Sequence, residues 1–242
     1  MKLRQFILIS IIFFLIISGA LIIYAFSKTW GKNDIEIKIH INEQLVQESA
    51  FGESPTFAIW LEDPKTNKTK TVFVTRRAAE EDWEGKAEVP VALPAWFYVN
   101  KEKKYQQIPD ATEGGDPEQI IITGATPKPG YFVKRISVEQ DSDWILWIEV
   151  NLAGDFNEQY MEFNTELNIA DEYMTGQPAL IYRTNITASS GTKIVPEILG
   201  MTVVDSTLEK IIRPMEGIST ASNIFDEISL NVVKTKPRII SW

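Results

Sequence analysis

The sequence contains no cysteine and a single histidine, His40. The lack of cysteine excludes a disulfide framework and lipid attachment through a cysteine thiol. It does not identify a cellular compartment, because proteins without cysteine occur in all of them. A zinc site built on His and Cys ligands is excluded by the same two counts. A Ser-His-Asp arrangement has His40 as its only available base. We expect His40 to face solvent, because it alternates with apolar residues along a predicted strand.

Positive charge is also scarce, with 24 Lys and Arg residues against 33 Asp and Glu residues and a net charge of −9. Nucleic acid is therefore not expected as a partner, because binding to phosphates needs clustered cations. The acidic balance is typical of a domain that is kept soluble by its charge.

Residues 6–26 form the one long apolar run, and they carry no charge. At about 1.5 Å per residue, a helix of this length crosses a hydrocarbon core of about 30 Å. We predict a transmembrane signal anchor here, preceded by a cytoplasmic tail at residues 1–5. A tether at residues 27–34 and a single domain at residues 35–242 are expected to follow.

The alternative for this run is a cleaved signal peptide, because Lys2 and Arg4 precede it and the small residues 18–20 resemble a cleavage site. Cleavage there would leave an apolar new terminus, whereas Tyr24 and Trp30 suit the membrane interface of a retained helix. We therefore favour the anchor. The basic tail favours a single-pass protein of the cell membrane, with the large domain on the extracytoplasmic, periplasmic side.

The rest of the chain predicts a mainly β fold, an antiparallel β-sandwich of the immunoglobulin- or fibronectin-like kind. Residues 35–41 alternate strictly between Ile and polar side chains, which predicts a half-buried strand. Residues 144–150 are apolar on both faces, which predicts a central, covered strand. A helical turn is expected at residues 219–227. The other expected strands are residues 57–62 and 71–75, paired as a hairpin, and residues 131–138, 178–186, 193–204 and 228–233.

Residues 76–130 lack a strong period and predict an insertion of the kind that often has a function. A short helix at residues 76–83 and edge strands at residues 94–99 and 119–123 are expected within it. Its charged and aromatic side chains are the candidate binding surface, although the same aromatics would also serve to pack the insertion on the sandwich. The candidate residues are Arg76, Arg77, Trp83, Trp96 and Tyr98.

Several short motifs resemble an uncharacterised bacterial family of predicted periplasmic proteins with a domain of unknown function. They are F-A-I-W-L-E-D at residues 57–63, V-T-R-R-A-A-E-E-D-W at residues 74–83, A-L-P-A-W at residues 92–96 and T-G-A-T-P-K-P-G at residues 123–130. Members of this family often occur beside flavin-dependent membrane redox modules. The resemblance implies an accessory role in such an assembly, with a membrane-protein partner.

Residues 123–126, T-G-A-T, also resemble the end of the flavinylation signature D-x-x-[ST]-G-A-[ST]. Thr126 would then carry FMN as a phosphoester. The sequence departs from the signature at Ile120, where the signature has an acidic residue. The alternative is a strand that ends in a turn fixed by the prolines and glycine of residues 127–130.

Asp155, Asn157 and Glu158 place oxygen ligands of the kind that Ca²⁺ prefers in one loop. Their spacing does not match a regular calcium loop, and a solvated turn with an Asx hydrogen bond is the favoured alternative. We expect no metal and no resident cofactor.

These observations predict a membrane-anchored, extracytoplasmic binding or accessory module without catalytic activity of its own. The membrane bilayer, through residues 6–26, and a membrane protein are the expected partners. An electron carrier with covalent FMN on Thr126 and a carbohydrate- or surface-binding adhesin are the two alternatives.

Overall fold

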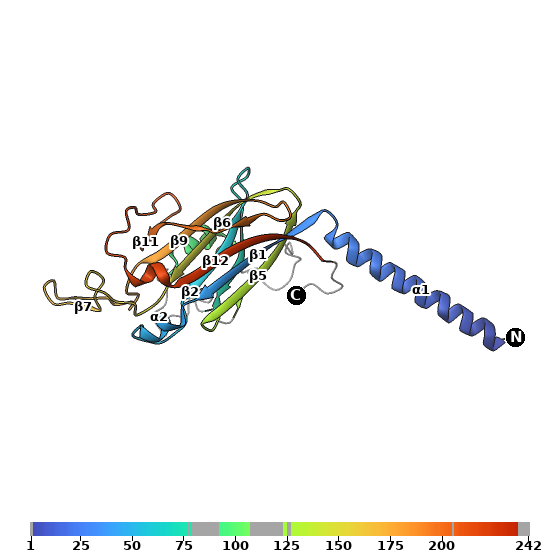
Figure 1. Cartoon of the computed structure of the whole chain (residues 1–242), viewed down its shortest axis with the longest axis horizontal. Coiled ribbons are helices and arrows are strands. Elements are labelled where there is room, and N and C mark those ends of the chain that lie inside the picture. The colour runs from blue at the N-terminus through green and yellow to red at the C-terminus, as the bar shows by residue number, and fades with distance from the viewer. Residues whose placement is uncertain are drawn as a thin grey trace.

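The computed structural model describes residues 2–76, 78, 92–106, 123–124, 127–204 and 206–236. The chain is a mainly β protein in which two antiparallel sheets pack in a sandwich-like arrangement, as predicted. One N-terminal apolar helix leaves the sandwich at one end (Figure 1).

That helix is α1 (Lys2–Thr29), and its window Ser10–Ser27 has a mean hydropathy of 2.4 with 6% of the window buried. By length and composition it is able to cross a membrane, and a signal sequence near an N-terminus passes the same test. Strand β1 (Lys32–Ile41) begins only two residues after α1 ends. The helix and this strand thus include all but Trp30 and Gly31 of residues 27–34, the range predicted as a tether.

The helix continues to Thr29, whose Oγ1 donates to the carbonyl of Ala25 at 3.3 Å. The strand starts early because Asn33 and Asp34, which are buried, have hydrogen-bond partners inside the domain. Asn33 Nδ2 donates to the carbonyl of Ala188 at 2.7 Å, and Asp34 Oδ1 accepts from Thr235 Oγ1 at 2.7 Å.

Strand β1 lies in the middle of a four-stranded sheet with the order β10-β12-β1-β5. Strands β5 (Gly130–Glu139) and β12 (Phe225–Lys234) flank it, and β10 (Lys193–Ile194) pairs with β12. The alternation predicted for β1 is confirmed, because all four of its isoleucines are fully buried while Glu36, Lys38 and His40 face outward.

The second sheet has six strands in the order β11-β9-β6-β2-β3-β4. Its strands are β2 (Thr56–Glu62), β3 (Thr69–Thr75), β4 (Thr123–Gly124), β6 (Asp143–Asn151), β9 (Ala179–Thr187) and β11 (Glu197–Thr202). The predicted hairpin of β2 and β3 is confirmed, and β6 has the predicted central position between β2 and β9. The short strand β4 pairs in parallel with β3.

The main core lies between the two sheets and contains the isoleucines of β1 together with Phe57, Leu146 and Tyr182 of the larger sheet. A second core covers the other face of the larger sheet, where Trp60 stacks on Trp147 with ring centroids 6.1 Å apart. Strand β6 is thus covered on both faces, as its sequence predicts.

Helix α4 (Pro94–Gln106) covers that second face through Ala95 and Trp96, together with Leu93 just before the helix. The edge strand predicted at residues 94–99 is therefore wrong. Proline at the first helical position suits this helix, because the missing N–H has no partner there in any case.

Three local features also differ from the sequence-based expectation. The region predicted as one strand at residues 193–204 is divided between β10 in one sheet and β11 in the other, with Pro196 between them. A helix, α2 (Glu43–Glu48), follows β1 and is capped by Asn42, whose side chain accepts from the N–H of Leu45. The turn expected at residues 219–227 is the 3-10 helix η2 (Thr220–Asn223), directly before β12.

Candidate functional site

A hollow of about 360 Å³ lies beside strand β7 (Phe163–Asn164), and this strand is at the end of the sandwich opposite to α1 (Figure 1). One wall is the arm, by which we mean residues 158–174 with the short strands β7 (Phe163–Asn164) and β8 (Ile169–Ala170). The other walls are the residues just before β9 and the residues that follow β11, including Val203 and Val204. Residues between 159 and 179, residues 202–204 and Asn151 at the end of β6 therefore form this site.

The base of the arm is fixed by Asp155, a buried residue just after β6. Its Oδ1 accepts from Thr220 Oγ1 at 2.7 Å, and its Oδ2 accepts from Gln177 Nε2 at 2.9 Å. Burial raises the pKa of the Asp155 carboxyl, although these two hydrogen bonds act to lower it. The carboxylate thus joins the segments at both ends of the arm to η2.

Gly176 allows the two ends of the arm to approach closely. It has a φ of +68°, and a Cβ at this position would lie 2.5 Å from the carbonyl oxygen of Asp155. A residue with a side chain would be strained by its backbone conformation and would also collide with that carbonyl. The closure of the arm therefore requires glycine here.

Side chains of the arm shape its turns by bonding to nearby backbone groups. Asn157 Oδ1 accepts from the N–H of Tyr160 at 2.8 Å, and Asn164 Oδ1 accepts from the N–H of Leu167 at 3.0 Å. Asp171 Oδ2 accepts from Thr175 Oγ1 at 3.1 Å and from the N–H of Gly176. In these Asx-type contacts, polar side chains near the hollow bond to neighbouring groups of the same loop and stabilise its turns.

Apolar side chains of the arm are left open to solvent beside the hollow. Leu167 is 67% exposed, Ile169 60% and Met161 46%. Val203 and Val204 are also exposed on the facing wall. Exposed apolar side chains that gather around a concavity are typical of a binding site.

The calcium candidates Asp155, Asn157 and Glu158 lie at the base of this arm, but they do not form a cation cage. Both side-chain oxygens of Asp155 accept hydrogen bonds, and Asn157 Nδ2 donates to the carbonyl of Gly217 at 2.8 Å. Glu158 is exposed. Among the described residues, no group of three or more His, Cys, Asp or Glu side chains is placed to hold a metal ion.

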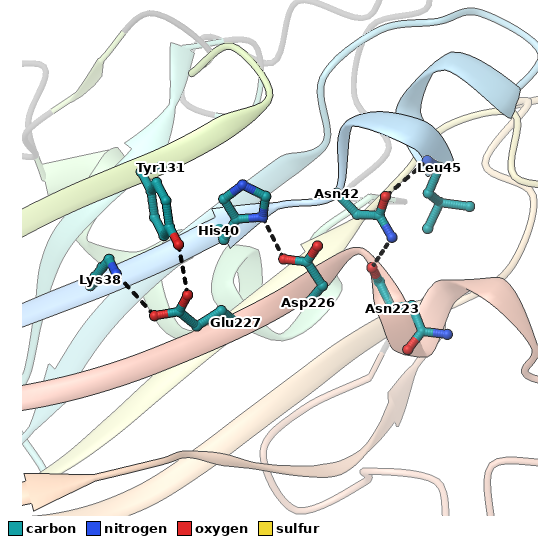
Figure 2. A network of polar contacts seen from close by, with 8 residues as sticks. All are labelled: Lys38, His40, Asn42, Leu45, Tyr131, Asn223, Asp226 and Glu227. Atoms are coloured by element: carbon teal, nitrogen blue, oxygen red, sulfur yellow. Dashed lines mark hydrogen bonds and ion pairs between the residues drawn. The ribbon is translucent and has the colours of Figure 1, made fainter.

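The outer face of the four-stranded sheet carries a polar network that includes His40 (Figure 2). His40 Nδ1 lies 2.6 Å from Asp226 Oδ1, and Glu227 accepts from Lys38 Nζ at 3.0 Å and from the Tyr131 hydroxyl at 2.9 Å. The pairing of β1 with β12 shifts register between His40 and Ile41, so that both Asp226 and Glu227 are exposed on this face.

This network joins β1, β5 and β12 on the outer surface of the sheet. The pKa of Glu227 is lowered, mainly by the hydrogen bond from Lys38. Such exposed ion pairs stabilise strand register modestly. We therefore assign this face a structural role, which agrees with the predicted solvent-facing position of His40.

Glu149 of β6 lies at the second core, and its side chain is fully buried. Its oxygens accept from the backbone N–H groups of Ala95 at 3.1 Å and Trp96 at 2.7 Å, and from Thr202 Oγ1 at 2.6 Å. Burial raises its pKa to about 7, against the lowering effect of these three hydrogen bonds. Glu149 therefore satisfies the first N–H groups of α4 and holds that helix on the sheet.

The sequence did not identify Glu149 as important, although one signal was present. A single acidic residue in the apolar run of residues 144–150 is costly to bury without partners, and it therefore indicates a specific interaction. The hollow was also not predicted from the sequence. The signal for it was the set of apolar residues that stand between the glutamates of residues 158–172.

The predicted binding surface in the insertion is only partly within the described residues. Trp96 is 5% exposed, and its Nε1 donates to Thr71 Oγ1 at 3.2 Å, so it packs the second core and offers no free ring for a ligand. Arg76 and Tyr98 are exposed. Arg77, Trp83 and Thr126, the predicted FMN attachment residue, lie outside the described residues, so their roles stay predictions.

Comparison of the chain with models of protein families, with curated proteins and with solved structures finds no match.

Proposed function

We propose that this chain is a membrane-anchored, extracytoplasmic binding module without catalytic activity of its own, and that the hollow beside the arm is its ligand site. The observation that carries the proposal is the position of the hollow at the end of the sandwich opposite to the apolar helix (Figure 1). A module built in this way displays its binding site away from the membrane.

The anchor half of the proposal rests on α1. The helix is apolar along Ser10–Ser27, and its side chains there are almost all exposed, so the domain does not use them for its own core. Tyr24 and Trp30, which is 81% exposed, lie where aromatic rings favour the membrane interface. The basic residues Lys2 and Arg4 favour the N-terminus on the cytoplasmic side.

The binding half rests on the hollow and its exposed apolar rim. Its volume falls at the lower end of the range for ligand sites. Two facing antiparallel sheets fit the immunoglobulin- or fibronectin-like class, whose loops gather at the ends of the sandwich and often bind partners. An accessory role in a flavin-linked membrane assembly is compatible with this site and stays a prediction from the family resemblance.

A photo-activated cross-linker tests the site directly. A photoreactive phenylalanine derivative is introduced at Leu167, on the arm, or at Val195, which is 70% exposed and does not line the hollow. The full chain is expressed in cells that naturally make the protein, and its membranes are irradiated. We expect a discrete covalent adduct from position 167 and none from position 195. Equal labelling from both positions, or no adduct from position 167, would contradict the proposed site.

A further inference from the structure

We propose that the hollow and the arm bind a segment of a partner protein in which apolar side chains are flanked by Lys or Arg residues. This inference rests on the proposed function and names the chemistry of its partner. Two properties of the arm support this proposal. Its apolar side chains are exposed, and its charged side chains are all acidic.

The apolar side chains set the centre of the recognised segment. Leu167 and Ile169 are more than half exposed, and they line the hollow together with Val203 and Val204. A volume of about 360 Å³ holds a few side chains of a peptide rather than a folded surface. The polar groups of Asn164 and Asp171 already bond within the arm, so few of them remain to select a polar ligand.

The charges around the hollow set the flanks of that segment. Residues 136–182 contain no Lys or Arg, and the arm alone carries Glu158, Glu162, Glu166, Asp171 and Glu172. The first three of these are exposed, and within the described part of the chain they form no ion pair. An apolar site inside a negative field attracts a partner that carries positive charge beside its apolar side chains.

The same charge argues against a lipid surface as the occupant. The negative head groups of anionic membranes would be repelled by the carboxylates of the arm. The arm also points away from α1, at the far end of the sandwich (Figure 1). A protein segment with basic flanks is the occupant that fits both the apolar and the acidic features.

Three fluorescent peptides test this inference on the full chain held in nanodiscs of zwitterionic lipid. The first has an apolar core of Leu, Ile and Val between Lys residues, the second has the same core between Glu residues, and the third has Ser in place of the core between Lys residues. Fluorescence anisotropy gives their dissociation constants. We expect the first peptide to bind at least about tenfold more tightly than either of the others, and its binding to weaken as salt is raised.

Charge removal on the arm gives the matched comparison. The triple variant Glu158→Gln, Glu162→Gln and Glu166→Gln is expected to bind the first peptide about tenfold more weakly. The control variant Glu139→Gln, Asp143→Asn and Glu197→Gln removes the same number of exposed charges outside the hollow and is expected to bind like the wild type. The far-ultraviolet circular dichroism of both variants confirms that they fold.

The outcomes separate this inference from the proposed function. Equal affinity for the Lys-flanked and Glu-flanked peptides would overturn the basic-flank inference. If that result accompanies cross-linking from position 167, the hollow remains the binding site and only the chemistry of the partner is refuted. Equal weakening by the arm and control variants would show a general charge effect and would also overturn the inference.

Discussion

Replacement of Glu149 by Gln tests how α4 is held against the sheet. The Glu149 carboxyl is fully buried, and its pKa in the folded protein is about 7 rather than the ordinary 4.5. At about 1.4 kcal/mol per pKa unit, this difference corresponds to about 3 kcal/mol of unfolding free energy.

The sign follows from proton binding. Between pH 4.5 and 7, the folded protein holds a proton on Glu149 that the unfolded chain has released, so stability falls as pH rises through this window. The contribution is fully present below pH 4.5 and is lost above pH 7. The cause is the cost of keeping a charged carboxylate inside the second core.

Urea unfolding of the full chain in detergent, for wild type and Glu149→Gln at several pH values, measures this contribution. The other titrating groups are common to both proteins, so the difference between the two unfolding free energies isolates residue 149. We expect the wild type to lose about 3 kcal/mol relative to the variant between pH 4.5 and pH 8. Glu209→Gln, at an exposed position, serves as the control for the loss of a surface carboxylate.

A difference that stays constant with pH, or a carboxyl carbon signal of Glu149 that titrates below pH 5 in a nuclear magnetic resonance experiment, would refute the reasoning. Either result would mean that the two N–H groups of α4 and the Thr202 hydroxyl outweigh the desolvation of the carboxylate.

Three further substitutions test other parts of the structure. Gly176→Ala should lower the unfolding free energy by about 2 kcal/mol or more, because the residue is strained and collides with Asp155, whereas Gly191→Ala shares the positive φ but meets no atom within 4 Å and should cost less. Asp155→Ala should cost about 2 kcal/mol and increase proteolytic cleavage within the arm, because Thr220 and Gln177 lose their acceptor; an unchanged cleavage rate would contradict its role as the base of the arm. Asp226→Ala should change the unfolding free energy by less than about 1 kcal/mol, with a smaller effect at high salt, because its contact with His40 is largely exposed; a larger loss of stability would show that this surface network does more than we assign to it.

The sandwich was predictable because its strands carry their pattern locally. The alternation of β1 predicts which side chains enter the core, and the doubly apolar run of β6 predicts a strand covered on both faces. In both cases the burial of each side chain depends on strand geometry and not on the identity of a distant partner.

Helix α4 was not predictable in the same way. Residues 94–99 include aromatic and branched side chains that favour strands, so the local pattern gave the wrong element. The helix forms against the sheet, where the Glu149 carboxylate accepts the N–H groups of Ala95 and Trp96 from more than fifty residues away. A partner so distant in the sequence leaves no local signal beside the helix.

The candidate site was even less accessible to sequence reasoning, because the hollow needs three segments to be placed together. The calcium hypothesis was based on the oxygen ligands of the loop after β6, but the Asp155 carboxylate accepts hydrogen bonds from Gln177 and Thr220. The oxygens that suggested a metal ligand set instead hold the base of the arm. Local spacing does not distinguish these two uses of a carboxylate.

The short link between α1 and β1 determines where a retained anchor would place this site. A flexible tether would let the sandwich lie on the membrane, but only Trp30 and Gly31 separate the helix from the first strand. Strand β1 has ten residues and is roughly 33 Å long, and it runs from this link toward the end of the sandwich where β7 lies (Figure 1). This distance exceeds the screening length of about 8 Å at physiological salt several times over. If the anchor is retained and the arm is the binding site that we propose, its carboxylates would meet a partner that extends well above the lipid head groups.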